Sequence, residues 1–414
     1  LLSRRQRQMC IRDSMSSIQK MMQKLEPEYI KIRRYLHQHP ELSFQEENTT
    51  KFIKDELNKY GIEVYDNKGF TGAVGVLHGA MPGKTIALRA DIDALPVKEN
   101  TGLEFASVNE GCCHACGHDL HMTSLLAAAR LLSKYRQHLH GTVKFFFQPA
   151  EEKLGGSKTI INNGFLDDVD AVFGVHTWPD VPGGSIGIKY GPMMAGSDSF
   201  KITITAPGGH AAHPHKTPDP IAAAAYMITQ LQTIVSRELN PLDSAVITVG
   251  KMTAGTAANI IPSEVVLEGS MRYLLPETRR QIHESIKRIA DGTALALRVH
   301  AETEIIPGCG PVIGVDNLVG KIETSAAKLL GNDKVSILPS ASMGSEDFSF
   351  YLAKKPGAFF RIGTGMADPN SHLALHNGKL LFSEDAISAG AVTFCGIVFP
   401  VSYTHLRAHE TCAD

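Results

Sequence analysis

The sequence predicts an α/β protein interrupted by a second, smaller domain, and three features of the chain predict it. Apolar strand-like runs alternate with helical runs in the first half, as in a largely parallel sheet covered by helices. Residues 194–306 break that order with a β-α-β-β-α-β series, the split βαβ arrangement. The alternation returns after residue 306. We therefore expect a main domain with a mixed, largely parallel sheet flanked by helices (15–193 and 307–400) and a ferredoxin-like insert (194–306).

The elements of the main domain follow from hydrophobic periodicity and from helix stop signals. Two helices are predicted within residues 18–60, and the second ends before Gly61, a good helix stop. Short apolar runs predict strands, and longer apolar runs predict helices. The strands are expected at 72–79, 84–96, 142–152, 171–178 and 357–365, and the further helices at 119–139, 316–331 and 383–399.

The insert has its own series of elements. Residues 199–209 alternate apolar and polar side chains, which is typical of a half-buried strand, and a helix follows at 219–239. Two more strands are expected at 244–255 and 263–274. The next helix, 276–297, opens on a proline, which is common at the first helical position, and a strand at 298–308 closes the series.

The composition indicates a water-soluble globular protein. Of its 414 residues, 43% are hydrophobic and 20% are charged. A net charge of -2 gives no basic field to recruit nucleic acid, and no apolar run approaches the roughly 20 residues that span a bilayer. We therefore expect a small-molecule partner, and neither a nucleic acid nor a membrane.

The cysteines indicate the cellular compartment of the protein, and the two chain ends indicate where the predicted fold begins and ends. Seven cysteines, three of them crowded within 112–116, make a poor disulfide framework and a better thiol or metal cluster. No secretory signal pattern precedes them, so a cytoplasmic location is expected. Residues 1–14 and 401–414 have no clear amphipathic period and resemble translated sequencing-adapter read-through. They are interpreted as non-native ends and left out of the predicted fold.

Candidate ligands follow several predicted strands. Asp91 and Asp93 end one strand, Glu151 and Glu152 end the next, and His176 follows AVFGV. In open α/β sheets ligands bind at the carboxyl ends of the strands, so one shared site is expected there. Taken singly, each has a plainer explanation: a turn or helix cap for the aspartates, a solvated pair for the glutamates and a structural role for the histidine.

The densest cluster is HACGHDLH (114–121). Cys116 offers a soft thiolate, and His118 and His121 offer imidazole nitrogens. A local structural zinc knuckle is the alternative, because Cys112, Cys113 and His114 lie close by in the sequence. That alternative lacks a second Cys/His pair at finger spacing, and the donors lead directly into a helix.

Taken in order, nine segments resemble those of the metal-dependent amidohydrolases that include hippurate hydrolase, aminoacylase, N-acetyl-diaminopimelate deacetylase and indole-acetyl-amino-acid hydrolase. The resemblance covers about residues 25–398 and rests on HQHPELSFQE, LRADIDALPVKE, HACGHDLHM, QPAEEKLGG, GVHTW, APGGHAAHPH, NIIP, GSEDFSFY and LHN. Two segments depart from the usual pattern: Cys112 and Cys113 are extra, and LHNGKLLFSED replaces the usual Asn-Pro run after the last ligand.

The resemblance implies a role for each matched residue. The metal ligands fall on Cys116, His118, Glu152, His176 and His376, and the general base on Glu151. His210 matches a histidine of the inserted lid that helps polarise the scissile carbonyl, often from the partner subunit. Asp93, with Asp91, matches an acidic pair that orients a ligand histidine. Asn259 and Arg272 match polar residues on the substrate side of the lid. Arg272 is expected either to hold the amino-acid carboxylate, which a guanidinium matches bidentately, or to be a surface arginine on a strand.

The implied activity is hydrolysis of the amide bond of N-acyl amino acids by a homodimer that forms through the lid. Two divalent cations, manganese or zinc, would lower the pKa of bound water from about 16 towards 7, and Glu151 would accept its proton. Two alternatives stay open. One is a metal exopeptidase or dipeptidase, and the other is a non-catalytic protein with one structural zinc.

Overall fold

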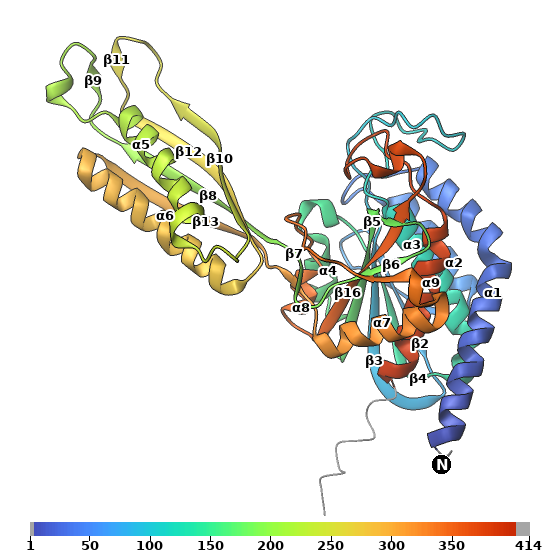
Figure 1. Ribbon diagram of the computed structural model, residues 1–414. Coiled ribbons are helices and arrows are strands. Elements are labelled where there is room, and N and C mark those ends of the chain that lie inside the picture. The colour runs from blue at the N-terminus through green and yellow to red at the C-terminus, as the bar shows by residue number, and fades with distance from the viewer. Residues whose placement is uncertain (1–3, 403–414) are drawn as a thin grey trace, which may run out of the picture. The chain divides into compact units, whose positions relative to one another are not determined.

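The computed structural model describes residues 4–402, with side chains from residue 17 onward, and divides the chain into two units (Figure 1). Unit 1 contains the chain up to Gly191, then Ile313–Ser340 and the part from Phe350 onward. Unit 2 contains Pro192–Val312 and Ala341–Ser349. The predicted insert 194–306 lies within the first segment of unit 2.

An eight-stranded mixed sheet forms the centre of unit 1, in the order β1-β2-β4-β3-β5-β16-β6-β15. The four central strands β4, β3, β5 and β16 run parallel to one another, while β1, β2 and β6 introduce antiparallel pairs. The predicted fold class, a mixed and largely parallel sheet, is confirmed. The strands are β1 (Glu63–Asp66), β2 (Ala73–His78), β3 (Met81–Asp91), β4 (His140–Gln148), β5 (Ala171–Pro182), β6 (Ile186–Ile188), β15 (Val335–Ile337) and β16 (Gly357–Gly365).

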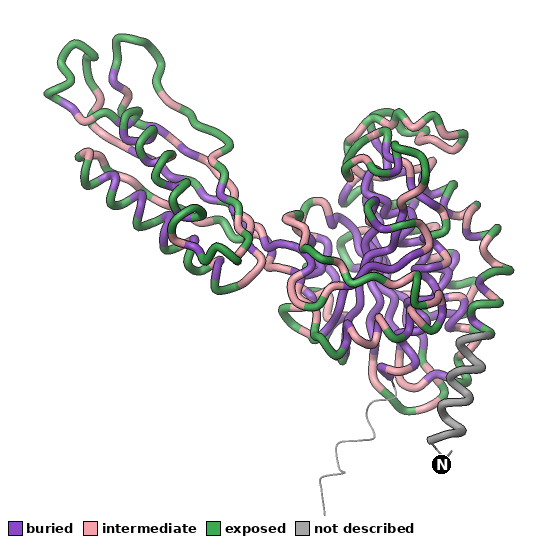
Figure 2. The backbone as a smooth tube through the Cα atoms, viewed as in Figure 1, coloured by how far each residue is buried: buried purple, intermediate pink, exposed green. Residues whose placement is uncertain are grey.

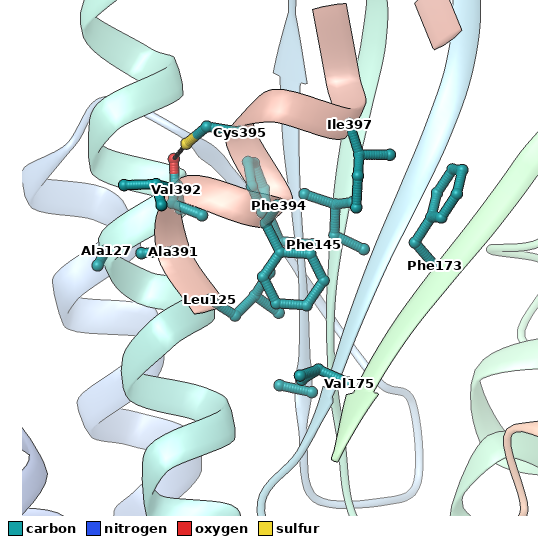
Figure 3. Close-up of a cluster of buried hydrophobic side chains, with 14 of the residues drawn as sticks. Leu125, Ala127, Phe145, Phe173, Val175, Ala391, Val392, Phe394, Cys395 and Ile397 are labelled. Atoms are coloured by element: carbon teal, nitrogen blue, oxygen red, sulfur yellow. Dashed lines mark hydrogen bonds between the residues drawn. The ribbon is translucent and has the colours of Figure 1, made fainter. Parts of the chain in front are cut away.

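Helices flank this sheet, and buried residues concentrate along it (Figure 2). They are α1 (Arg4–Gln38), α2 (Glu47–Lys59), α3 (His118–Lys134), α4 (Gly156–Asn162), α7 (Asp316–Leu330), α8 (Ser349–Leu352) and α9 (Asp385–Ser402). Side chains of α3, α9 and the sheet interlock in one apolar core, where Phe145 and Phe173 face Phe394 and Ile397 (Figure 3). This core fixes the N-terminus of α3 against the sheet.

Helix α9 is long and apolar enough to cross a membrane by length and composition alone. However, 83% of its most apolar window is buried inside the protein. Cys395 of α9 donates to the Ala128 carbonyl of α3 at 3.7 Å, which places the helix in the core of unit 1 (Figure 3). Its apolar surface is therefore already covered by protein.

The interpretation of the two chain ends as non-native stays a prediction. Helix α1 begins at Arg4 and runs through Met15 without a break, and α9 continues to Ser402. Both helices extend beyond the boundaries of 15 and 400 drawn from the sequence, because a helix needs no amphipathic period of its own where it continues a packed helix. Residues 1–3 and 403–414 lie outside the described residues.

Unit 2 has a ferredoxin-like order. Its antiparallel four-stranded sheet runs β10-β12-β8-β13, and a second apolar core lies between this sheet and two helices. Residues 234–238 continue α5 as a π-helical turn. The elements are β8 (Gly196–Thr205), α5 (Pro220–Thr233), β10 (Ala245–Ala254), β12 (Glu264–Tyr273), α6 (Pro276–Leu297) and β13 (His300–Cys309), with the short strands β7 (Pro192–Met194), β9 (Gly209–His210), β11 (Ile260–Ile261) and β14 (Val312–Ile313).

Candidate metal centre

The candidate site lies at the carboxyl ends of the parallel strands in unit 1. Strand β3 ends at Asp91, and β4 ends three residues before Glu151. His176 lies within β5, two positions before Trp178. Because parallel strands end at one edge of the sheet, these side chains come from separate strands to a single place. The sequence-based expectation of one shared site rested on the same topology.

A tight turn at Gly117 positions two of the candidate ligands, Cys116 and His118. Gly117 adopts φ 79°, a left-handed conformation, between Cys116 and His118, where α3 begins. A Cβ atom on Gly117 would lie 2.8 Å from Cγ2 of Thr177 and 3.2 Å from Phe382. Only glycine fits both the backbone angle and the space. The turn therefore aims the thiol and the imidazole at the same region.

Hydrogen bonds to protein oxygens set the tautomers of two histidines. Nδ1 of His118 lies 2.9 Å from the Asp93 carbonyl and 3.2 Å from its Oδ1, and Nδ1 of His176 lies 2.7 Å from the Thr177 carbonyl. A carbonyl oxygen accepts, so Nδ1 carries the proton in both rings. In the neutral ring, Nε2 then carries a free lone pair, which a metal ligand requires.

The acidic side of the site comes from a 3-10 turn, Glu151–Lys153, which follows Ala150 at φ 47°. Glu151 is buried, and the backbone N–H of Glu152 donates to Oδ2 of Asp93 at 3.1 Å. Oε1 of Glu152 lies 3.2 Å from Nε2 of His376. The two adjacent carboxylates thus take different places, one in the interior and one facing the histidines.

His376 is brought in from a distant loop. Its backbone adopts φ 68°, and its N–H donates to the carbonyl of Ala115 at 3.0 Å. That bond ties the loop to the residue just before Cys116. The sequence offered no local pattern that fixes this position; only the resemblance assigned His376 to the site.

The donor atoms fit a pair of divalent cations. Sγ of Cys116 lies 3.4 Å from Nε2 of His176. Nε2 of His118 is buried and has no hydrogen-bond partner among the described residues, and the neighbour printed for the buried Oε1 of Glu152 is the His376 ring at 3.2 Å. Their ligand atoms form three overlapping groups within 4.8 Å: Cys116, His118 and His176; Cys116, Glu152 and His376; and His118, Glu151 and Glu152. Thiolate, imidazole and carboxylate donors with orphaned lone pairs suit zinc, cobalt, nickel or manganese.

The pKa shifts of the buried site residues indicate that the site lacks positive charge. Burial lowers the pKa of His118, but the carboxylates of Asp91, Asp93 and Glu152 outweigh it and raise the value to about 10. Burial, together with the carboxylates of Glu152 and Glu151, raises the pKa of the Cys116 thiol well above its ordinary value. Burial and the neighbouring His121 lower the pKa of His176 well below 6.5. Cations at this point would neutralise the carboxylates and stabilise the thiolate.

His121, a candidate donor in the sequence, has both ring nitrogens engaged. The backbone N–H of Thr177 donates to its Nε2 at 2.7 Å, so its Nδ1 carries the proton and donates to Oδ1 of Asp91 at 2.5 Å. Asp91 in turn accepts from Arg89 at 2.8 Å. His121 therefore supports the site without a free lone pair. Sequence reasoning missed Arg89, although an arginine inside a buried strand is the signal that marks it.

The alternative of a zinc knuckle finds no support in the described residues. None of the possible metal-binding groups there contains Cys112, Cys113 or His114. The thiol of Cys112 donates to the carbonyl of Pro40 at 3.7 Å. Burial lowers the pKa of His114 to about 4, so its ring is neutral. The ring of His114 lies 6.4 Å from the ring of His37, between centroids.

The three lid residues lie in unit 2, at two different ends of its sheet. His210 pairs with Ile260 in the β9–β11 ribbon, and Asn259 accepts from the N–H of Ala211 at 3.1 Å. The ribbon joins β12 near Glu264 (Figure 1). Arg272 lies eight residues further along β12, about 27 Å away at the rise of a strand. The structure thus brings His210 and Asn259 together and places Arg272 apart from them.

A protein-family model described as peptidase family M20/M25/M40 matches residues 87–399. The chain belongs to this family. An N-acetyl-L-cysteine deacetylase of Bacillus subtilis is 43% identical over 341 residues, covering 82% of this chain and 81% of that protein. A hippurate hydrolase of Campylobacter jejuni is 39% identical over 369 residues, covering 89% of this chain and 94% of that protein.

A solved structure gives the same result at the level of the fold. A dinuclear metal-binding peptidase of the M20 family from Bacillus subtilis superposes with a TM-score of 0.82 at 36% identity, covering 92% of this chain and 99% of that one. The resemblance stated from the motifs is therefore confirmed: the chain is an M20-family protein, and relatives near 40% identity are N-acyl amino acid amidohydrolases.

Proposed function

We propose that this chain hydrolyses the amide bond of N-acyl amino acids, with two divalent cations held by Cys116, His118, Glu152, His176 and His376. The observation that carries the proposal is the cluster of thiol, imidazole and carboxylate donor atoms, in which Nε2 of His118 is buried without a hydrogen-bond partner among the described residues. An inert core would leave such atoms paired, because an unsatisfied buried polar group costs about 1–3 kcal/mol.

The residues around the cations divide the work of hydrolysis. When bound, the cations lower the pKa of water and polarise the scissile carbonyl. Glu151, buried beside the candidate ligands, accepts the proton of the attacking water and returns it to the leaving amine nitrogen. Asp93 holds His118 with Nε2 towards the cations through the contacts of its carbonyl and Oδ1.

His210 is a donor suited to a developing oxyanion. The backbone N–H of Ala212 donates to its Nδ1 at 3.0 Å, so in the neutral ring the proton is on Nε2. That Nε2–H is the group that can stabilise negative charge on the carbonyl oxygen. Asn259, its neighbour in the ribbon, adds a polar side chain for the substrate.

A homodimer through unit 2 would explain why these lid residues are far from Arg272. Strand β10 is an edge of its sheet, and α5 exposes Tyr226 and Ile221. An unpaired edge beside exposed apolar side chains suits a second copy of the chain. In such a dimer one substrate can meet His210 of one subunit and the cations of the other.

The expected cytoplasmic location is supported by the free thiols of all five described cysteines.

The test of the function is metal content together with a hydrolysis panel of N-acetyl, N-benzoyl and dipeptide substrates. We expect two cations per subunit and cleavage of N-acyl amino acids. A preference for dipeptides would favour the exopeptidase alternative. The panel includes dipeptides because a relative that is 36% identical is named thermostable carboxypeptidase 1. Glu151→Gln should keep both cations and lose turnover by about 10²–10⁴-fold. An unchanged rate in that variant would contradict the proposal.

The dimer has a separate test by complementation. Glu151→Gln and His210→Ala, each inactive alone, should regain activity when mixed and refolded or co-expressed. The mixed dimer then holds one complete site, so about one quarter of the wild-type rate is expected at random pairing. Failure to complement, with a monomer in sedimentation, would contradict catalysis across subunits.

A further inference from the structure

Thr177, the residue of β5 that follows His176, forms a hydrogen bond to the candidate metal centre with each of its polar groups. Its backbone N–H donates to Nε2 of His121 at 2.7 Å. Its carbonyl accepts from Nδ1 of His176 at 2.7 Å. Its hydroxyl donates to the carbonyl of Cys116 at 2.6 Å. This buried threonine is therefore bonded to two of the proposed ligands and to the histidine that supports them.

Only the hydroxyl contact depends on which side chain stands at position 177. The other two contacts belong to the backbone, so any residue except proline could make both of them. An O–H donor on Cβ is offered by threonine and serine alone. Its acceptor belongs to Cys116, a buried residue, so solvent has little access to replace the donor. Loss of the hydroxyl would therefore remove a hydrogen bond from a buried carbonyl beside a ligand thiol.

Two consecutive residues of β5 hold Cys116 at two different points. Nε2 of His176 lies 3.4 Å from its Sγ, and the Thr177 hydroxyl binds its carbonyl. Successive side chains of a strand leave opposite faces, so β5 reaches the thiol from one face and the backbone from the other. The position of the thiol relative to the imidazole is thus set by the strand as well as by the turn.

The methyl group of Thr177 restrains its hydroxyl. A Cβ atom on Gly117 would lie 2.8 Å from both Cγ2 and Oγ1 of Thr177, so both branches of the threonine lie against the turn. A β-branched side chain has few favourable χ1 rotamers, and close packing of Cγ2 leaves Oγ1 directed at the Cys116 carbonyl. Serine at this position would keep the donor and lose that restraint.

We propose that the hydroxyl of Thr177 is a positioning group for the metal centre, which holds Cys116 where its thiol and the His176 imidazole bind one cation. This inference rests on the proposed function and adds to it a residue that determines how tightly a cation is held. The donors concerned are Cys116, His118 and His176, whose ligand atoms lie within 4.8 Å of one another. Because Thr177 acts through Cys116, its loss should change cation affinity and leave the KM for substrate nearly unchanged.

The first experiment uses Co²⁺ as the probe, because a thiolate bound to Co²⁺ gives a charge-transfer absorption band that reports the cation at Cys116. Titration of the loaded protein with a chelator, followed at this band, measures the affinity. We expect Thr177→Val, which exchanges the hydroxyl for a methyl group, to weaken it by about 10- to 100-fold. Thr364→Val is the matched control, since Thr364 is buried on the neighbouring strand β16 and its Oγ1 has no hydrogen-bond partner among the described residues.

The second experiment separates the hydrogen bond from packing by comparing Thr177→Ser with Thr177→Ala. Both variants lack the methyl group, and only serine keeps the hydroxyl. We expect the serine variant to bind Co²⁺ at least about tenfold more tightly than the alanine variant. With Co²⁺ in excess, both should regain kcat, and their KM values should match that of the wild type. The melting temperature of the chelated protein checks folding, since a purely structural threonine would lower it without changing cation affinity.

The outcomes separate this inference from the proposed function. Equal Co²⁺ affinity in Thr177→Ser and Thr177→Ala, or in Thr177→Val and the wild type, would overturn the role of the hydroxyl while leaving amide hydrolysis intact. A wild-type protein that binds two Co²⁺ ions without the charge-transfer band would overturn Cys116 as a ligand, and with it the inference. A wild-type protein that carries both cations and cleaves no N-acyl amino acid would overturn the proposed function itself.

Discussion

Oδ1 of Asp91 accepts a hydrogen bond from Nδ1 of His121 at 2.5 Å, while Oδ2 of the same carboxylate lies 3.7 Å from Nε2 of His118. Asp91 thus contacts one histidine that is held entirely by the protein and one whose free nitrogen faces the candidate centre. Its negative charge is fixed there by Arg89. Burial alone would raise the pKa of Asp91, but His118 and Arg89 lower it well below its ordinary value.

Asp91→Asn should therefore weaken metal binding while keeping the shape of the site. An amide cannot supply the charge that favours a cation, and loss of such an outer carboxylate typically costs about 10- to 100-fold in affinity. The measurement is a competitive titration with a chromogenic chelator. Asp66→Asn, an exposed position in β1, is the control. Unchanged affinity in Asp91→Asn would mean that this carboxylate is purely structural.

Gly117→Ala should disturb the site through the backbone. The added Cβ would meet Cγ2 and Oγ1 of Thr177 at 2.8 Å, and the residue would remain at φ 79°. Either Thr177 or the turn must shift, and Cys116 and His118 move with it. We expect metal affinity to fall by more than tenfold, because a first ligand displaced by a few tenths of an ångström no longer matches the others. Gly250→Ala, where nothing lies within 4 Å, is the control.

The sequence predicted the layers of the fold well, because strand and helix order follow local periodicity. It placed β16 at residues 357–365, as observed, and found the insert from its β-α-β-β-α-β order. The helix expected at 119–139 instead begins at His118 and ends at Lys134, since Tyr135 leaves the helical conformation and a separate 3-10 turn follows. Such end points depend on packing that periodicity does not encode.

The site was predictable only where local pattern and topology agree. Cys116, His118 and the acidic pairs follow strand ends or open a helix, so residue type and position pointed to them. The distant His376 and the separation of Arg272 from His210 depend on three-dimensional arrangement.

A buried ion network behind the site should give a pH-dependent contribution to stability. His37 lies between two carboxylates, with Nδ1 2.9 Å from Asp119 and Nε2 3.1 Å from Glu99, and beside Arg33. Burial and Arg33 lower the pKa of His37, but Asp119 and Glu99 outweigh them and raise it above 6.5. Burial raises the pKa values of both carboxylates, but Arg33, 2.7 Å away, and His37 lower that of Asp119, and His37 lowers that of Glu99. The three shifts therefore agree.

The sign of the effect follows from the raised value. The folded state holds the His37 proton more tightly than the unfolded state, so its contribution is fully present below about pH 6.5 and is lost as pH rises through the folded pKa. We expect the difference in free energy of unfolding between wild type and His37→Gln to shrink above pH 6.5, by at most about 1.4 kcal/mol per pH unit. Urea titrations from pH 6 to 9 measure it. A difference that grows with pH would contradict the assignment.

Removing the cations should destabilise unit 1 and leave unit 2 unaffected. All five proposed ligands belong to unit 1, whereas unit 2 has a separate apolar core around Phe200, Ile202 and Ile286. A ligand at 100 times its Kd stabilises the unit that binds it by about 2.7 kcal/mol. Chelation should therefore lower the melting temperature of the unit 1 transition by several degrees.

The single tryptophan allows the two transitions to be told apart. Trp178 lies in β5 of unit 1, so its emission follows that unit, whereas far-UV circular dichroism follows both. We expect chelation to move the fluorescence transition to lower temperature and to leave part of the dichroism transition in place. Excess Mn²⁺ or Zn²⁺ should reverse the shift in wild type and much less in His376→Ala. Coincident loss of both signals at one lowered temperature would instead show that the two units unfold as one, because each would then report a single cooperative transition.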